Sequence, residues 1–331
     1  MVKLNRDKKL FSYLIVSSLI IISAVLFAKA SVYNPSTLQA AEPSFDQKTE
    51  EIELLPQPTM FVNTLILGID QDGLADVIIV ASYNLYTNQV IITSIPRNTY
   101  VEEQNWIEPD LGASHLCFAH YAGLGTDRNY QNGAVLTAYW VEALFGLAIH
   151  EYLTITYDAF IELVDLAGGV EVYVNPAFEG IKPNFFGRTV EPLPTGLQRL
   201  NGIQTFAFAH YRGYPDNPRI PEPGSDSEDG DRIRRNQRLI KAALSQARSM
   251  KLSEILAITR QLPAMVHTSY TIFDLTALAP DLYKVNTEEL TTIVIPGEMI
   301  EVFEEGSGEN THYFIVDFEK TKELLQSHGL I

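Results

Sequence analysis

The chain is poor in cysteine and in basic residues. Its 331 residues include a single cysteine, Cys117, so no disulfide can form within the chain. This cysteine lies in the apolar run Leu-Cys-Phe-Ala, which predicts a buried core residue rather than a reactive thiol. Lysine and arginine together number 24 against 41 acidic residues, giving a net charge of −17. A surface of that sign repels nucleic acid, so we expect no nucleic-acid partner.

Several familiar catalytic and metal-binding signatures are also absent. The sequence has no Gly-rich phosphate loop, no Ser-His-Asp order and no zinc-ligand spacing. His115 and His120 are five positions apart, a poor spacing for two metal ligands on one helix. The acidic stretch 224–231 resembles a calcium loop, but the twelfth position counted from Asp226 is Gln237 instead of glutamate. We expect a solvated loop there, with its last aspartates capping the next helix.

The N-terminus predicts a membrane anchor. Four basic residues within positions 1–9 precede an uncharged, largely apolar run at 10–28, which is long enough to cross a bilayer. Positive charge before the span favours a cytoplasmic N-terminus and an extracytoplasmic remainder. Ala28-Lys-Ala30 also fits a signal-peptidase site, so cleavage is the alternative. The polar, proline-containing stretch 29–60 predicts a linker, and residues 61–331 a single domain.

The domain mixes strands and helices. Strand patterns occupy 62–69, 77–83 and 90–95, and a turn at 84–88 joins the last two, which predicts consecutive antiparallel strands. Further strands are expected at 152–157, 170–174 and 291–295. Helices are expected at about 133–145, 158–166, 201–209, 231–250 and 318–328, with others up to about 283. The pattern predicts a mixed α/β (α+β) fold with a central, mostly antiparallel sheet flanked by helices.

Arginines cluster at the start of the predicted helix 231–250. Arg232 and Arg235 are three residues apart and share one face, whereas Arg234 and Arg238 share another. Guanidinium groups bind phosphate oxygens in a planar, bidentate manner, so the first pair suits a pyrophosphate. The alternative is an ordinary solvated basic face.

Two aspartates flank the turn between the first two strands. If these strands form a hairpin, Asp70 and Asp76 lie near each other at its end, where their charges repel. Magnesium, which binds one or two carboxylates together with water and phosphate oxygens, would relieve that repulsion. The alternative is that both are ordinary turn aspartates.

Short motifs along the domain occur in the order seen in one bacterial family. They are Gly68-Ile-Asp70, Asp76, Ser94-Ile-Pro-Arg97, LVDLAGGVEV at 163–172, Leu200-Asn-Gly through Ala209-His-Tyr-Arg212, and Asp229-x-x-Arg232-x-x-Arg235-x-Gln237. From about residue 62 to the C-terminus the sequence resembles the LytR-CpsA-Psr family. That family is membrane-anchored and transfers glycopolymers from a polyprenyl pyrophosphate carrier to peptidoglycan.

The resemblance implies roles for particular residues. Asp70 and Asp76 would bind Mg²⁺, and Asp76 would also assist deprotonation of the attacking hydroxyl. The pyrophosphate-binding, catalytic arginines would be Arg97, Arg212, Arg232 and Arg235, with Gln237 as a further substrate-binding residue. The apolar stretch 134–147, with Phe160 and Leu163, would line a tunnel for the polyprenyl chain. The implied partners are a polyprenyl-(pyro)phosphate-linked glycan, the peptidoglycan acceptor and the membrane.

The sequence also departs from the family pattern. The connection between Asp70 and Asp76 is short and lacks the usual arginine, and Asn98 replaces the aspartate that usually follows Arg97. Tyr214 stands where a further arginine is expected. Two alternatives therefore stay open: a non-catalytic, polyprenyl-phosphate-binding envelope regulator, and a polyprenyl pyrophosphatase that uses water as acceptor.

Overall fold

The structure, a computed structural model, describes residues 61–101, 115–175, 190–211, 228–278, 281–285, 290–304 and 309–331. The predicted anchor at 10–28, the linker at 29–60, Arg212 and the acidic loop up to residue 227 lie outside the described residues. Within the described ranges, no helix combines the length and apolar composition that a bilayer crossing requires.

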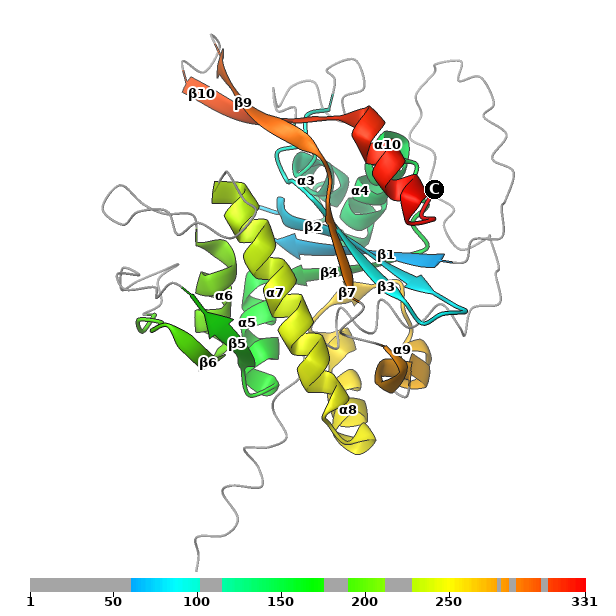
Figure 1. The fold of residues 1–331 in the computed structure, drawn as a ribbon, viewed down its shortest axis with the longest axis vertical. Helices are drawn as coiled ribbons and strands as arrows, with labels where there is room; N and C mark the ends of the chain where they lie inside the picture. Colours follow the sequence, from blue (N-terminus) through cyan, green and yellow to red (C-terminus); the bar gives the residue numbers. More distant parts are fainter. Residues whose placement is uncertain are drawn as a thin grey trace, which may run out of the picture.

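A six-stranded sheet in the order β7-β4-β1-β2-β3-β8 forms the centre of the molecule (Figure 1). Its strands are β1 (Phe61–Ile69), β2 (Ala75–Asn84), β3 (Val90–Ile95), β4 (Glu151–Thr156), β7 (His267–Thr268) and β8 (Thr291–Val294). The β1/β2, β2/β3 and β4/β7 pairs are antiparallel, whereas β1/β4 and β3/β8 are parallel. This confirms the predicted mixed fold with a mostly antiparallel sheet.

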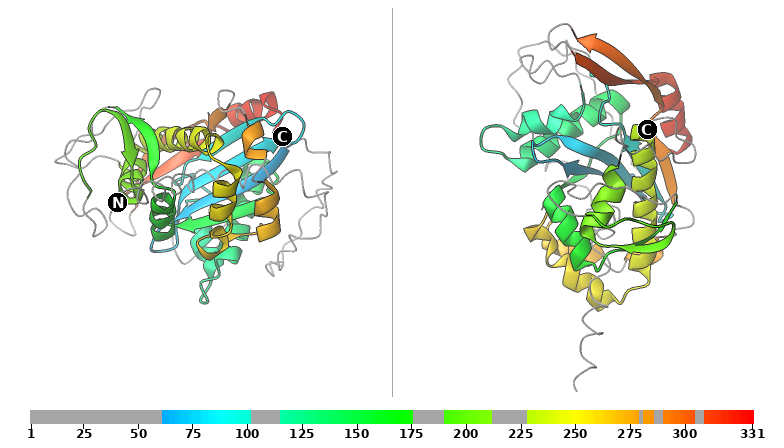
Figure 2. Two further views of the ribbon diagram at one scale, coloured as in Figure 1. Left: turned by 90° about the horizontal axis from the view of Figure 1, so that it is seen from below. Right: turned by 90° about the vertical axis from the view of Figure 1, so that its left-hand side faces the viewer.

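Helices cover both faces of the sheet (Figure 2). One face packs on α3 (Phe118–Leu124), α4 (Tyr130–Phe145) and α10 (Phe318–Ser327). The other packs on α5 (Tyr157–Leu166), α7 (Glu228–Arg248), α8 (Leu252–Thr259) and α9 (Ile272–Leu278). Because successive side chains point to opposite faces, Leu65 and Leu67 enter one core and Ile66 the other. This double burial explains the continuous apolar run of β1.

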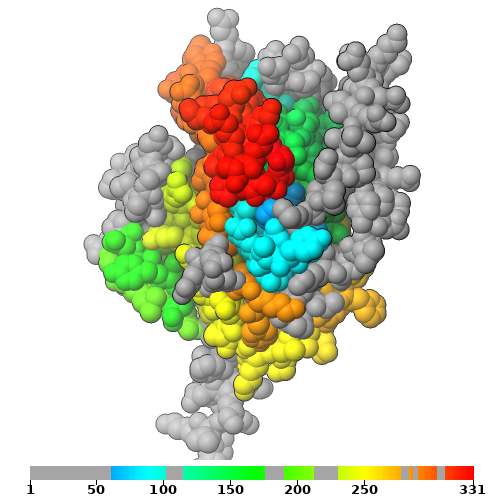
Figure 3. Space-filling view, turned by 45° about the vertical axis from the view of Figure 1, so that its right-hand side comes forward, coloured from blue at the N-terminus to red at the C-terminus, as the bar shows by residue number. Residues whose placement is uncertain are grey.

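Smaller elements extend from this layered body. The ribbon of β5 (Val170–Val174) and β6 (Gly196–Leu200) packs with α6 (Gly202–His210) and α7 around a third core. The hairpin of β9 (Gly297–Glu304) and β10 (Glu309–Val316) lies beyond the sheet, and α10 follows it (Figure 1). In the space-filling view, α10 (red) lies at the surface beside β2 and β3 (cyan) (Figure 3). Two short 3-10 helices span Leu262–Ala264 and Asp281–Lys284.

Candidate active site

Asp76 lies in a β-bulge at the end of the β1/β2 hairpin. Gly68 pairs with Val77 and Ile69 pairs with Ala75, so Asp76 is an extra residue without an opposite partner on β1. A bulge of this kind turns a side chain away from the regular ladder, and bulges are common beside active sites. The hairpin prediction is confirmed, and the bulge gives Asp76 an orientation that regular strand alternation does not predict.

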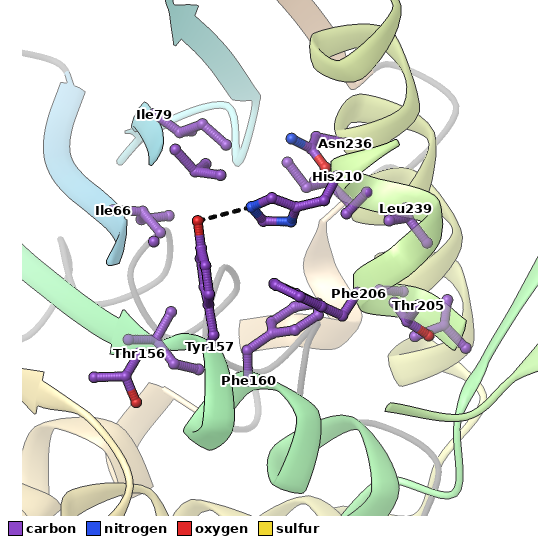
Figure 4. Close-up of a pocket in the computed structure, with 17 residues that line it drawn as sticks. Ile66, Ile79, Thr156, Tyr157, Phe160, Thr205, Phe206, His210, Asn236 and Leu239 are labelled. Carbon is purple, nitrogen blue, oxygen red and sulfur yellow. Dashed lines mark hydrogen bonds between the residues drawn. The ribbon is translucent and has the colours of Figure 1, made fainter. Parts of the chain in front are cut away.

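Within the described part of the chain, side chains from three other segments contact the Asp76 carboxylate. Its Oδ1 forms an ion pair with Nη1 of Arg97, which follows β3. The Tyr157 hydroxyl, at the start of α5, donates to Oδ2, and His210 Nε2, at the end of α6, lies 3.3 Å from the same oxygen. His210 Nε2 also lies 2.9 Å from the Tyr157 oxygen (Figure 4). Because the phenol donates its only proton to Asp76, the imidazole N–H is the donor to the phenol oxygen.

Local structure explains why these groups meet. Thr156 caps α5 by accepting a hydrogen bond from the Ala159 amide, so the helix begins directly after β4. β4 runs parallel to β1, with Thr156 opposite Ile69, and the ends of the two strands therefore bring Tyr157 next to the loop that starts at Asp70. Asn201 and Gln204 form a capping box that fixes the start of α6.

Asp70 organises the turn that precedes Asp76. Its Oδ1 accepts hydrogen bonds from the amides of residues 72, 73 and 74 at 3.0, 2.9 and 2.8 Å. Burial and the nearby Asp76 charge raise the pKa of the Asp70 carboxyl, against the lowering effect of these amides and of Arg97. Asp70 thus makes the contacts of a turn aspartate and also experiences the predicted repulsion from Asp76.

The two carboxylates predicted to bind magnesium differ in their contacts. The Asp76 oxygens already contact Arg97, Tyr157 and His210, whereas Asp70 has one oxygen without a hydrogen bond among the described residues. Within the described ranges, every hydrogen bond to the Asp70 carboxylate ends on Oδ1, which leaves Oδ2 for a cation. No group of three histidine, cysteine, aspartate or glutamate side chains gathers in the described part of the chain. Magnesium commonly takes only one or two carboxylates and completes its shell with water and phosphate. The donor set matches that pattern, and magnesium remains a prediction.

The arginines of α7 divide by burial as their helical spacing predicts. Arg232 and Arg235 are 3% and 1% exposed, whereas Arg234 and Arg238 are only partly buried. Arg235 Nε donates to the Phe208 carbonyl at 2.8 Å, and its Nη2 donates to the Tyr211 carbonyl. Arg235 therefore fastens the C-terminal end of α6, next to His210.

Gln237 and Arg97 are also held by protein contacts. The Gln237 amide donates to Ser94 Oγ and to the Ile293 carbonyl, each at 3.3 Å, and so links α7 to two strands of the sheet. Nη2 of Arg97 lies 3.6 Å from the Cys117 sulfur. Cys117 is 1% exposed, which confirms that it is a core residue, and burial raises the pKa of its thiol.

An apolar cavity of about 110 Å³ opens beside this polar cluster. Strands β1, β2 and β4 and helices α5, α6 and α7 line it, and Tyr157 and His210 contribute to its wall (Figure 4). Of the predicted tunnel residues, Phe160 lines the cavity. The prediction for 134–147 was wrong, because Trp140 and Phe145 of α4 pack in the core on the opposite face of the sheet. Periodicity reveals an apolar face but not which side of the sheet it covers.

Sequence reasoning assigned no role to Tyr157, His210 or Asn236. His210 stands in the motif Ala209-His-Tyr-Arg212, and its position two residues before an arginine was a usable signal. Tyr157 carried no such signal, because its place depends on the parallel pairing of β1 with β4. Asn236 shares the helix face of Arg232 and lines the cavity.

Comparison with known proteins identifies the family. The profile of the LytR_cpsA_psr family matches residues 26–328. The chain belongs to the LytR-CpsA-Psr family. The chain is similar to the polyisoprenyl-teichoic acid–peptidoglycan teichoic acid transferase TagU of Oceanobacillus iheyensis. The two are 30% identical over 220 residues, which are 64% of this chain and 60% of that protein. The transferase TagV of Bacillus subtilis is 23% identical over 313 residues, 88% of this chain and 72% of that protein.

Solved structures of LytR-CpsA-Psr proteins share the fold. The crystal structure of B. subtilis TagV superimposes with a TM-score of 0.62 at 22% identity, covering 82% of this chain and 98% of TagV. The structure of TagT bound to LIIa-WTA gives a TM-score of 0.60 at 19% identity, covering 85% of this chain and 94% of TagT.

Proposed function

We propose that this family member is a membrane-anchored, extracytoplasmic phosphotransferase that attaches a polyprenyl-pyrophosphate-linked glycopolymer to peptidoglycan. The observation that carries the proposal is the Asp76, Arg97, Tyr157 and His210 cluster, whose last two members also form the wall of the apolar cavity. A lipid pyrophosphate needs this combination, because its chain is apolar and its head group is anionic. The relatives TagU and TagV are polyisoprenyl-teichoic acid–peptidoglycan teichoic acid transferases, which supports the same substrate class.

In the proposed reaction, a hydroxyl oxygen of peptidoglycan forms a bond to the phosphorus that carries the glycan. The bond from this phosphorus to the bridging oxygen breaks, and that oxygen leaves as part of polyprenyl phosphate. Asp76 receives the hydroxyl proton, while Tyr157 and His210 hold its carboxylate in place. Magnesium bound to Asp70 and Asp76 would neutralise charge on the phosphate oxygens.

Arginines would supply most of the remaining charge stabilisation. Arg97 lies beside Asp76, and Arg232 is buried one helical turn before Asn236, which lines the cavity. Arg212, two residues beyond His210, would add a third guanidinium. Fixed cations aimed at phosphate oxygens stabilise the transition state without reorganisation, so positioning is the main task of the protein in this chemistry.

One observation favours a second candidate, a non-catalytic protein that binds lipid-linked phosphate. The Asp76 carboxylate is engaged by an arginine, a phenol and an imidazole at once, which limits its availability as a base. Such a protein would bind the carrier in the same cavity without transferring the glycan.

Transfer from a lipid-linked glycan to peptidoglycan oligomers by the purified full-length protein tests these candidates. We expect a covalent glycan–peptidoglycan product and released polyprenyl phosphate, both lost in Arg97→Ala. Arg199→Ala is the control, because Arg199 forms an exposed ion pair with Glu171 on the β5/β6 ribbon. Carrier binding without product would favour the non-catalytic candidate, and release of glycan phosphate to water would favour the pyrophosphatase.

A further inference from the structure

His120 is a completely buried histidine outside the polar cluster of the active site. It lies on α3 and is 0% exposed. Its Nδ1 lies 2.8 Å from the carbonyl oxygen of Gly73, in the loop that joins Asp70 to Asp76. Since a carbonyl oxygen can only accept, Nδ1 carries the proton. The bond therefore links a rigid helix to the middle of the loop between the two predicted metal ligands.

The other ring nitrogen of His120, Nε2, is buried against helix α4. His120 Nε2 has no hydrogen-bond partner among the described residues. It lies against the backbone of α4, where a Cβ added to Gly133 would approach within 2.8 Å of it. A polar atom buried without a partner is unfavourable. The ring nevertheless occupies this site, and its one hydrogen bond goes to the loop.

Among the described residues, the other contacts of the loop are hydrogen bonds within it, packing against α3 and one backbone hydrogen bond at its end. The side chain of Asp70 binds amides of the loop, and the Asp70 amide donates to the Leu74 carbonyl at 3.0 Å. Gly73 has a φ of +100°, and a Cβ there would lie 2.5 Å from Leu124 of α3, so the loop backbone is pressed against this helix. At the far end, the Ala75 amide donates to the Cys117 carbonyl at 3.1 Å. Among the described residues outside the loop, His120 supplies the side-chain hydrogen bond to its central residue, Gly73.

We propose that His120 is a positioning residue whose hydrogen bond to the Gly73 carbonyl sets the relative placement of Asp70 and Asp76 for binding one divalent cation. The inference rests on the proposed function, in which these two carboxylates share the metal. Gly73 is three residues from each aspartate, so a shift of its carbonyl moves both ends of the loop. Partners that orient metal ligands commonly change metal affinity by about 10–100-fold when they are removed.

Three substitutions separate the hydrogen bond from the volume of the ring. His120→Leu removes the donor, whereas His120→Asn places an amide nitrogen where Nδ1 was. His120→Gln has the same chemical group one bond farther from the backbone. His150→Leu is the matched control, because His150 Nδ1 is also bonded to the backbone, accepting from the Asn63 amide at 3.1 Å, and burial also lowers the pKa of its ring.

The first measurement is the affinity of the metal-free, full-length protein for Mn²⁺ alone. Electron paramagnetic resonance detects the Mn²⁺ that stays unbound. We expect His120→Leu and His120→Gln to weaken binding by about 10–100-fold, and His120→Asn and His150→Leu to retain the wild-type affinity. If His120→Leu does not fold, the difference in Mn²⁺ affinity between His120→Asn and His120→Gln tests the proposal. Equal affinity in the Asn and Gln variants would overturn the proposal.

The second measurement is amide hydrogen exchange of Gly73 and Leu74 without metal. We expect faster exchange in His120→Gln than in His120→Asn, and no change in His150→Leu. Wild-type protein that binds Mn²⁺ but transfers no glycan would refute the proposed function and leave this inference to be judged on affinity and exchange. Wild-type protein that binds no Mn²⁺ would refute the inference.

Discussion

Arg235 Nε lies 2.8 Å from the carbonyl oxygen of Phe208, so the most deeply buried arginine of α7 holds the end of α6 instead of pointing into open space. Its second carbonyl partner, Tyr211, directly follows His210. These two hydrogen bonds give Arg235 a structural role, because they hold the C-terminal end of α6 against α7.

We expect Arg235→Ala to lower the free energy of unfolding by about 2–4 kcal/mol, because two buried carbonyl groups lose their donor. Urea denaturation measures this change. Arg234→Ala, at a partly exposed position on the same helix, is the control and should shift stability by less than about 1 kcal/mol. Equal stability of the two variants would contradict the role given to Arg235.

Arg232→Ala should weaken binding of a polyprenyl pyrophosphate analogue more than Arg234→Ala or Arg238→Ala. Arg232 is buried and lies one helical turn before Asn236, which lines the cavity, whereas Arg238 donates to the Tyr173 carbonyl at 3.3 Å on the β5/β6 ribbon. Loss of a partly buried phosphate contact should change binding by about 2–5 kcal/mol, which calorimetry can resolve. Similar small losses in all three variants would indicate a generally basic surface.

Tyr157→Phe should lower kcat about 10- to 100-fold with little change in carrier binding. The substitution keeps the aromatic ring in the cavity wall and removes the hydroxyl that donates to Asp76, a hydrogen bond to a charged group. Steady-state transfer kinetics give kcat and KM separately. Tyr173→Phe, on the exposed side of the ribbon, should leave both unchanged.

Asp70→Asn should stabilise the metal-free protein at neutral pH. The amide oxygen can still accept from the loop amides, but the charge that burial and Asp76 disfavour is gone. Because the pKa of Asp70 is raised in the folded state, this carboxyl keeps its proton to a higher pH in the folded protein than in the unfolded chain. Its contribution to stability therefore falls as pH rises above 3.8. Thermal unfolding should show a higher Tm for Asp70→Asn at pH 7 and no difference well below pH 3.8. A lower Tm at pH 7 would contradict the predicted repulsion.

Acid should destabilise the fold partly through His120. Burial lowers the pKa of His120 from 6.5 to about 4, with smaller lowering contributions from His267 and Arg128 and an opposing one from the Gly73 bond. The folded protein therefore favours the neutral ring. The contribution of this neutral ring to folding stability is present above pH 6.5 and is lost as pH falls toward 4. Between pH 7 and pH 4, the free energy of unfolding should therefore decrease by about 2–3 kcal/mol less in His120→Asn than in the wild type. Urea titrations between pH 7 and 4 measure it, and unchanged pH dependence in His120→Asn would contradict the expectation.

Local patterns were sufficient to predict the hairpin of β1 and β2, because the turn between Asp70 and Asp76 is short and the flanking runs are clearly strand-like. The burial split of Arg232 and Arg235 from Arg234 and Arg238 also follows from helical spacing alone. Tyr157 and His210 could not be placed in the same way. Their meeting with Asp76 depends on strand pairing and helix packing between segments 53 or more positions apart.

Other elements were missed for identifiable reasons. α3 has only seven residues, too few for its periodicity to stand out, although it carries His120. β9 and β10 contain charged and polar residues among apolar ones. Their hairpin contacts the segment after β3 through backbone hydrogen bonds between Phe314 and residues 98 and 100. The α4 helix was predicted, but its apolar residues were expected to line the polyprenyl tunnel. They pack in the core on the opposite face of the sheet, and amphipathicity does not indicate which face a helix covers.

The parallel pairing of β8 with β3 has a consequence for how the chain reaches its native state. Ile91 pairs with Thr291, 200 positions later, and Gln237 donates to the carbonyl of Ile293 on the joining strand. One edge of β3 pairs with β2, and the other pairs with β8. Until β8 has been synthesised, this second edge lacks its partner strand. Distant pairings of this kind slow folding, and an open strand edge favours association with other chains. Chains that terminate before residue 290 should therefore accumulate as aggregates, so residues 290–331, about the last eighth of the protein, protect the chain from misassembly.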